Sequence, residues 1–319
     1  MSLWAPLGSS FSGGWWLRMS GGPGRVGVLD VGCFSAHLVV VDGSLSRPVL
    51  THKTRLRLDR ALDGDARVLR PGVEAVVAAV GEAERAARRA GVRLLVPWAT
   101  SVLRDAPNAA EVFAEVRRRT GLRFTVLGGA EEARLSYTAA RRWFGARIGP
   151  MVVLDIGGGT VEVAAGHEGE PSVAASFPYG ARTLSRSPVD PAVVRADARA
   201  VLGDVRDHHA VACSKVFEQL ARLSGARPQR DGPHVPRTLR LRDLRHWIPR
   251  LAAMPPGKRA RLPGISRHRA GQCLAGARVA EALMTAAGHD EVAICPWSTR
   301  EGLLLSLIGA DDDEICRAA

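Results

Sequence analysis

One pattern of apolar and polar residues occurs twice in the chain, about half its length apart. Residues 28–35 read VLDVGCFS and residues 153–160 read VLDIGGGT, and each segment is followed by a second run that favours β structure, at 38–41 and at 161–164. An apolar run, a turn with glycine and a second apolar run predict a strand, a tight turn and a returning strand. One copy alone is typical of an ordinary hairpin, but two copies in the same register predict two related domains.

The rest of the chain alternates between short apolar runs and stretches in which apolar residues recur with helical spacing. We expect strands at 25–30, 36–42, 49–58, 92–97, 124–127, 210–214 and 292–294. We expect helices at 72–90, 109–120, 130–144, 191–205 and 215–223, a mostly helical region at 241–288, and a last helix ending near residue 308. Asn108 is the expected cap of the helix at 109–120. Strands that alternate with helices predict an α/β architecture.

The 319 residues are enough for two domains with separate cores. The segment 145–150 is the expected boundary, which gives an N-terminal domain at 25–148 and a C-terminal domain at 149–310. Residues 1–24, with many Gly and Ser, are expected to form a disordered extension, and 311–319 an acidic tail.

Composition restricts the partners and the compartment. The net charge of +12 and the pI near 10.7 favour an acidic partner. Much of the arginine lies on predicted helix faces, as at Arg85, Arg88 and Arg89, where solvated surface and a channel for a polyanion are both consistent with it. No nucleic-acid motif is present, and no apolar run is long enough to span a bilayer, so neither nucleic acid nor membrane is an expected partner. Five scattered cysteines without C-x-x-C spacing indicate reduced thiols in a cytoplasmic protein.

The two repeated turns carry residue types suited to binding phosphate. Glycine permits φ > 0, so that consecutive backbone N–H groups can converge on an anion. Ser35 and Thr160 each follow the aspartate of their turn by five residues and add a hydroxyl donor. A carboxylate repels phosphate, so Asp30 and Asp155 are expected to hold a divalent cation or to orient an attacking water. The pattern therefore predicts two domains that face each other across a phosphate-binding cleft.

Six segments in order along the chain resemble the exopolyphosphatase / guanosine pentaphosphate phosphohydrolase (Ppx/GppA) family. They are LDVG…SAHL (29–38), ATSVLRDAPNA (99–109), GGAEEARL (128–135), VLDIGGGTVEV (153–163), SKVFEQLARLSGA (214–226) and CPWSTREG (295–302). The chain looks most similar to the short, two-domain actinobacterial exopolyphosphatases, and the resemblance covers residues 25 to about 309. It implies an actin-like, ribonuclease-H-like (ASKHA) fold with a phosphate clamp adapted to polyphosphate or guanosine pentaphosphate.

The resemblance also implies roles for individual residues. Glu132 matches the general base for the attacking water, Arg104 matches an arginine that contacts phosphate oxygens, and Asp155 and Glu162 match acidic positions that hold Mg²⁺. The phosphate-binding positions would be Asp30, Gly32, Ser35, Gly157, Gly158, Gly159, Thr160, Ser214 and Lys215. The residues alone leave alternatives open. Glu132 is also consistent with a carboxylate favoured at a helix N-terminus, and Arg104 with the ion-pair partner of Asp105.

The first loop departs from the family pattern. The family has Asp-x-Gly-Ser-Asn-[Ser/Thr] there, whereas Cys33 and Phe34 occupy the middle positions in this chain. Phe34 would put an apolar ring beside the phosphate, and Val216 stands where close relatives carry a Thr hydroxyl. Each missing partner costs about 1–3 kcal/mol. The clamp is therefore expected to be weaker than in relatives.

Four functions follow from these observations. The leading one is Mg²⁺-dependent release of terminal orthophosphate from inorganic polyphosphate, and the second is hydrolysis of guanosine pentaphosphate. The third is a non-catalytic paralogue that binds either compound and regulates a partner, which the altered first loop favours. The fourth, an actin-like sugar kinase, would need an adenosine-binding motif, and 225–236 offers no clear one. The family fold often forms a homodimer, although no apolar seam in the sequence demands it.

Overall fold

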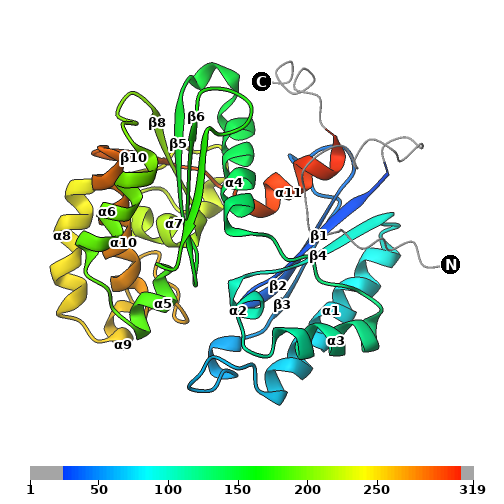
Figure 1. The fold of residues 1–319 in the computed structure, drawn as a ribbon. Coiled ribbons are helices and arrows are strands. Elements are labelled where there is room, and N and C mark those ends of the chain that lie inside the picture. Colours follow the sequence, from blue (N-terminus) through cyan, green and yellow to red (C-terminus); the bar gives the residue numbers. More distant parts are fainter. Residues whose placement is uncertain (1–23, 310–319) are drawn as a thin grey trace. The chain divides into compact units, whose positions relative to one another are not determined.

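The computed structural model describes residues 24–309, which form two compact units. Unit 1 contains the chain up to Leu127 together with the segment from Leu303, and unit 2 is Gly128–Gly302 (Figure 1). The predicted extension at 1–24, except for Gly24, and the predicted tail at 311–319 lie outside the described residues. Within the part of the chain that is described, no helix is long and apolar enough to cross a membrane.

Unit 1 is a four-stranded sheet covered on one face by two long helices. Its strands are β1 (Val26–Val31), β2 (Ser35–Val41), β3 (Leu50–Arg55) and β4 (Leu94–Ala99), in the order β3-β2-β1-β4. The first three are antiparallel neighbours, whereas β4 runs parallel to β1. Alternate residues of β1 and β2 pack against α1 (Arg70–Arg89) and α3 (Ala109–Thr120). A short helix, α2 (Ser101–Arg104), directly follows β4.

Unit 2 has a six-stranded sheet in the order β7-β6-β5-β8-β10-β9. The strands are β5 (Met151–Ile156), β6 (Val161–Gly166), β7 (Val173–Phe177), β8 (His209–Cys213), β9 (Thr238–Arg240) and β10 (Glu291–Ile294). The helices are α4 (Gly129–Phe144), α5 (Ala181–Arg186), α6 (Pro191–Leu202), α7 (Ser214–Leu223), α8 (Leu241–Ala252), α9 (Pro256–Arg259) and α10 (Cys273–Ala287). The last helix, α11 (Thr299–Ile308), begins in unit 2.

The alternation of side chains along β5 separates two cores. Val152, Leu154 and Ile156 pack on the side of α5, α6, α7, α8 and α10. Met151 and Val153 point the other way, where α4 covers the sheet (Figure 1). Because successive strand residues point to opposite faces, Asp155 lies on the α4 face.

The two units repeat one topology. The order β7-β6-β5-β8 in unit 2 corresponds to β3-β2-β1-β4 in unit 1, with two antiparallel pairings and one parallel pairing in each. The duplicated hairpin and the α/β fold predicted from the sequence are confirmed.

Several boundaries differ from the expectations. The expected domain boundary at 148/149 falls inside unit 2, because α4 packs on β5, β6 and β7. The strand expected at 124–127 is reduced to an isolated bridge between Trp98 and Thr125. Strands β7 and β9 were missed, since their segments are short and rich in small or charged residues.

The prediction that the Asn108 side chain caps the helix at 109–120 is wrong. Asn108 precedes α3, but its side chain makes no capping hydrogen bond. The buried amide instead accepts from the Val68 N–H and donates to the Val68 carbonyl, both at 2.9 Å. Asn108 therefore joins the start of α3 to the segment before α1.

Asn108→Ala should destabilise unit 1 by about 1–3 kcal/mol, because two backbone groups of Val68 lose their partner. The measurement is the urea midpoint of the transition followed by circular dichroism. Ser46→Ala is the matched control, since it removes an exposed hydrogen bond to Ser44 and should change the midpoint little. Equal midpoints for the two variants would contradict the role assigned to Asn108.

Candidate functional site

The candidate site in unit 2 lies where three parallel strands end. Strands β5 and β8 are parallel, as are β8 and β10. Their carboxyl ends lead into the glycine loop at 157–160, the start of α7 at Ser214, and the segment before α11 that holds Ser298. Open α/β sheets bind ligands at this edge. The sequence-predicted residues of unit 2 are therefore brought together.

A pair of acidic side chains is the central feature of this site. Asp155 on β5 and Glu162 on β6 are directly opposite each other in the antiparallel ladder, and each is only 5% exposed. Glu132, 6% exposed, stands in the first turn of α4, which covers the same face. Like charges opposite each other on neighbouring strands destabilise a sheet. Three buried carboxyl groups here are a cost to the fold that points to a function.

Hydroxyl groups are the hydrogen-bond partners of the Asp155–Glu162 pair. Asp155 Oδ2 accepts from Ser298 Oγ at 2.7 Å and from Ser136 Oγ at 3.1 Å. Glu162 Oε1 accepts from Ser176 Oγ at 2.8 Å. Within residues 24–309 neither Asp155 nor Glu162 forms an ion pair. Within the described residues the two carboxyl groups are thus hydrogen-bonded but not paired with a cation.

The pKa values of the pair reflect this environment. Burial raises the pKa of Glu162 well above its ordinary value, and the charges of Glu132 and Asp155 raise it further. Burial also raises the pKa of Asp155, although the hydrogen bonds from Ser298 and Ser136 oppose that shift. Strongly shifted carboxyl groups gathered in one place are a recognised mark of functional sites.

The glycine loop presents its amides on one side because its carbonyls are held on the other. The amides of Ala181 and Arg182, at the start of α5, donate to the carbonyls of Gly157 and Gly158, and Gly180 N–H donates to Gly159. In a trans peptide the N–H points away from the C=O. The amides of residues 158–160 therefore point away from α5, as in an anion-binding nest.

Glycine is required at Gly180 for this contact. A Cβ built on Gly180 would lie 2.3 Å from the carbonyl carbon of Gly159. The Arg182 guanidinium also lies against the loop, 3.5 Å from a Cβ built on Gly158. The start of α5 thus both fixes the loop and places a cation beside it.

Ser214 and Lys215 stand at the junction of β8 and α7. Ser214 has φ +84°, a left-handed conformation that costs a residue with a side chain about 1–3 kcal/mol. Its hydroxyl oxygen is buried and has no hydrogen-bond partner within residues 24–309. Lys215 is largely exposed and pairs with the buried Glu218 at 2.5 Å. Val216, the next residue, is buried in the core of unit 2.

The predicted residues of unit 1 form a second group. Gly32 N–H donates to the Ser35 carbonyl at 3.0 Å and closes the first hairpin after Asp30. The side chain of Phe34 packs against the core of unit 1, and the Phe34 carbonyl accepts from Leu56 N–H. Phe34 is thus partly buried, and its position beside a bound phosphate stays a prediction. Cys33 is buried, and no disulfide forms within residues 24–309.

Arg104 is held by neighbours in unit 1. Its Nε donates to Asp105 at 2.8 Å, and Nη1 donates to the Leu127 carbonyl at 3.2 Å. The ion pair that the sequence left open as an alternative is thus present. A role of Arg104 in phosphate binding stays a prediction.

Several residues of the site were not predicted from the sequence. The carboxylates of Asp155 and Glu162 accept hydrogen bonds from Ser136, Ser176 and Ser298. The hydroxyl of Thr299 is hydrogen-bonded to that of Ser136 at 2.9 Å. The approach of α11 to α4 needs Gly302, because a Cβ there would lie 2.0 Å from the Leu135 carbonyl oxygen. The segment 295–302 was recognised as a family motif but carried no assigned role.

The donor set is compatible with a hard divalent cation. Among the described residues no three His, Cys, Asp or Glu side chains are arranged to hold an ion by themselves. Mg²⁺ is commonly bound by one or two carboxylates, with phosphate oxygens and waters completing its six ligands. Asp155 and Glu162 offer two carboxylates that have no ion-pair partner in the described part of the chain, so the residues present fit Mg²⁺ bound together with a phosphate substrate.

Comparison with known proteins gives consistent matches. Residues 38–310 match the family described as Ppx/GppA phosphatase, a range that begins just after the altered first loop. "Exopolyphosphatase 1" of Mycobacterium leprae is 41% identical over 91% of this chain and 91% of its own length. An uncharacterised protein of Streptomyces coelicolor is 44% identical over 88% of this chain and 89% of its own length. A solved exopolyphosphatase from Cytophaga hutchinsonii superposes with a TM-score of 0.75 at 20% identity, covering 90% and 99% of the two chains, and shows a shared fold.

Glu162→Gln should change how stability depends on pH in metal-free protein. A carboxyl group whose pKa is raised in the folded state keeps a proton that the unfolded chain has released, so stability falls as pH rises above its unfolded pKa of about 4.3. The variant should flatten this fall and be more stable at pH 8 by on the order of 1 kcal/mol. Urea unfolding with a chelator at pH 5 and pH 8 measures it. Glu168→Gln, on the exposed turn after β6, is the control, and an identical pH dependence in both variants would contradict the assignment.

Proposed function

Because this chain belongs to the Ppx/GppA phosphatase family, we propose that it hydrolyses the terminal phosphoanhydride of inorganic polyphosphate and releases orthophosphate. The observation that carries the proposal is the buried group of Glu132, Asp155 and Glu162 beside a glycine loop with outward amides. The 41% identity to an exopolyphosphatase along 91% of the chain supports the choice of substrate. The net charge of +12 suits a polyanion.

In this proposal the carboxyl groups divide the work of phosphoryl transfer. Glu132, which is buried in the first turn of α4, takes the proton from the attacking water as general base. Asp155 and Glu162 would hold Mg²⁺, which when bound neutralises charge on the non-bridging oxygens of the phosphate. Ser136 and Ser298 keep Asp155 in one orientation through its Oδ2.

The loops supply the positioning. The amides of residues 158–160 are turned to one side and would donate to the oxygens of the terminal phosphate. The Ser214 hydroxyl, which is buried and has no partner in residues 24–309, gains an acceptor when a phosphate is bound. Lys215 would add positive charge, and the role of Arg104 in unit 1 stays a prediction. Most of the rate acceleration in such sites comes from positioning and electrostatics.

A second candidate is a binding protein that has lost most of its activity. Cys33 and Phe34 replace polar residues of the first loop, and Phe34 packs into the core of unit 1. The family match begins at residue 38, beyond that loop. Intact Glu132, Asp155 and Glu162 favour the enzyme.

Glu132→Gln should lower kcat for orthophosphate release from long-chain polyphosphate with Mg²⁺ by about 10²–10⁴-fold, the usual contribution of a general base. Glu131→Gln is the matched control: it removes the neighbouring carboxylate of the same helix turn and should retain most activity. The assay is repeated with guanosine pentaphosphate.

The outcomes separate the candidates. Release from polyphosphate that is lost only in Glu132→Gln supports the exopolyphosphatase. Release from guanosine pentaphosphate alone assigns the protein to the nucleotide branch of the family. Absence of release from both substrates, in wild-type protein that binds polyphosphate, contradicts the enzyme and supports the binding protein.

A further inference from the structure

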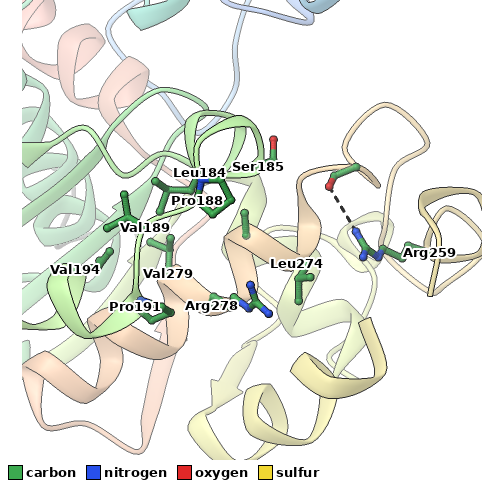
Figure 2. A pocket seen from close by; sticks show the side chains of 12 residues that line it. Leu184, Ser185, Pro188, Val189, Pro191, Val194, Arg259, Leu274, Arg278 and Val279 are labelled. Atoms are coloured by element: carbon green, nitrogen blue, oxygen red, sulfur yellow. Dashed lines mark hydrogen bonds between the residues drawn. The ribbon is translucent and has the colours of Figure 1, made fainter. Parts of the chain in front are cut away.

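A pocket of about 240 Å³ lies in unit 2 away from the carboxylates of the candidate site. Its walls come from the end of α5, the segment before α6, the start of α6 and the first half of α10 (Figure 2). Most of the residues that line it are aliphatic or proline, among them Leu184, Pro188, Val189, Val194, Leu274 and Val279. A concave apolar surface with a few polar groups is typical of a small-molecule site.

Two arginines and no carboxylate line this pocket. Arg259, at the end of α9, is only 8% exposed, whereas Arg278 on α10 is exposed. Within residues 24–309 neither arginine forms an ion pair. A buried, permanently charged guanidinium is costly unless an opposite charge compensates it.

The hydrogen bonds of Arg259, which include one with the side chain of Cys273, leave donors unused. Nε donates to the Leu251 carbonyl at 2.9 Å, and Nη1 lies 3.5 Å from the Gly271 carbonyl (Figure 2). Arg237, the other buried arginine of unit 2, donates four hydrogen bonds of 3.0 Å or less to four carbonyls. A guanidinium has five N–H donors. Arg259 therefore keeps part of its capacity for a group in the pocket.

We propose that this pocket binds a small organic anion, with its acidic group on Arg259 and Arg278 and its apolar body against the aliphatic wall. The acidic group is a carboxylate, sulfonate or phosphate, all of which accept paired hydrogen bonds from arginine. The volume limits the body to about one or two rings or a short hydrocarbon chain.

Helix α5 connects the pocket to the glycine loop. Its first residues donate to the carbonyls of Gly157 and Gly158, and its later residues Leu184 and Ser185 line the pocket. Ser185 Oγ also donates to the Arg182 carbonyl at 2.7 Å, within this six-residue helix. A ligand that orders α5 also orders the loop. Binding of the anion in the pocket does not depend on the proposed function. A regulatory effect of that binding rests on the proposed function, in which the glycine loop binds the phosphate.

The test uses 1-naphthalenesulfonate as the probe and 1-naphthylmethanol as its uncharged counterpart, with binding followed by naphthalene fluorescence. The sulfonate should bind at one saturable site, at least tenfold more tightly than the alcohol. Arg278→Ala and Arg259→Met should each weaken it at least tenfold, and Ala275→Phe, which fills the pocket, should abolish it. Arg195→Ala removes an exposed arginine of α6 outside the pocket and should leave the affinity unchanged.

Equal affinities for sulfonate and alcohol, or binding that survives Ala275→Phe, would overturn the site. Arg278 is exposed, so the Arg278→Ala variant still tests the site if a variant with a buried substitution fails to fold.

The coupling between the pocket and the glycine loop is measured by hydrogen exchange. The saturating probe should slow exchange of the amides in 157–160 and 180–186 at least threefold. If exchange is slowed only at the amides in 188–194 and 271–279, which line the pocket, the proposed coupling to the glycine loop is overturned. Neither readout needs catalysis, so a wild-type protein without phosphatase activity would refute the proposed function and leave these results intact.

Discussion

Asp155 and Glu162 lie opposite each other on neighbouring strands, and this pair determines which groups the elements around it must supply. Two carboxylates opposite each other under a covering helix are unfavourable. The surrounding elements compensate with hydroxyls from α4, β7 and the segment before α11, which hold both side chains in place. Within residues 24–309 neither side chain forms an ion pair, so in the proposed function the pair is left for a metal ion that accompanies the phosphate.

The glycine loop is a hairpin turn whose amides are directed outward by the hydrogen bonds of its carbonyls. A helix N-terminus usually offers its amides to an anion directly. Here the first amides of α5 bind the loop carbonyls, and the loop turns its own amides outward. The loop is therefore held by α5, whose later residues line the pocket with the two arginines that form no ion pair within residues 24–309.

Sequence reasoning was most successful where one local signal decided the structure. The repeated strand, glycine turn and strand predicted both hairpins, and the helical period of 72–90 and 130–144 predicted α1 and α4. It could not place β7, whose segment VAASF is stabilised by pairing with β6. It could not assign Ser136 and Ser298 either, because only the fold brings residues 162 positions apart to one carboxylate. The position of Asn108 was right and its partner wrong, since Val68 is distant in sequence.

If the proposed metal site is right, Glu162 is a buried carboxyl group that shares its site with other charges and that a divalent cation can neutralise. The decisive experiment is titration of the side-chain carboxyl carbons by ¹³C NMR, without metal and with Mg²⁺ plus a non-hydrolysable phosphate analogue. We expect a Glu162 pKa above the ordinary glutamate value in metal-free protein, because of burial and the charges of Glu132 and Asp155, and a lower pKa when Mg²⁺ is bound. An ordinary pKa that does not respond to Mg²⁺ would contradict it.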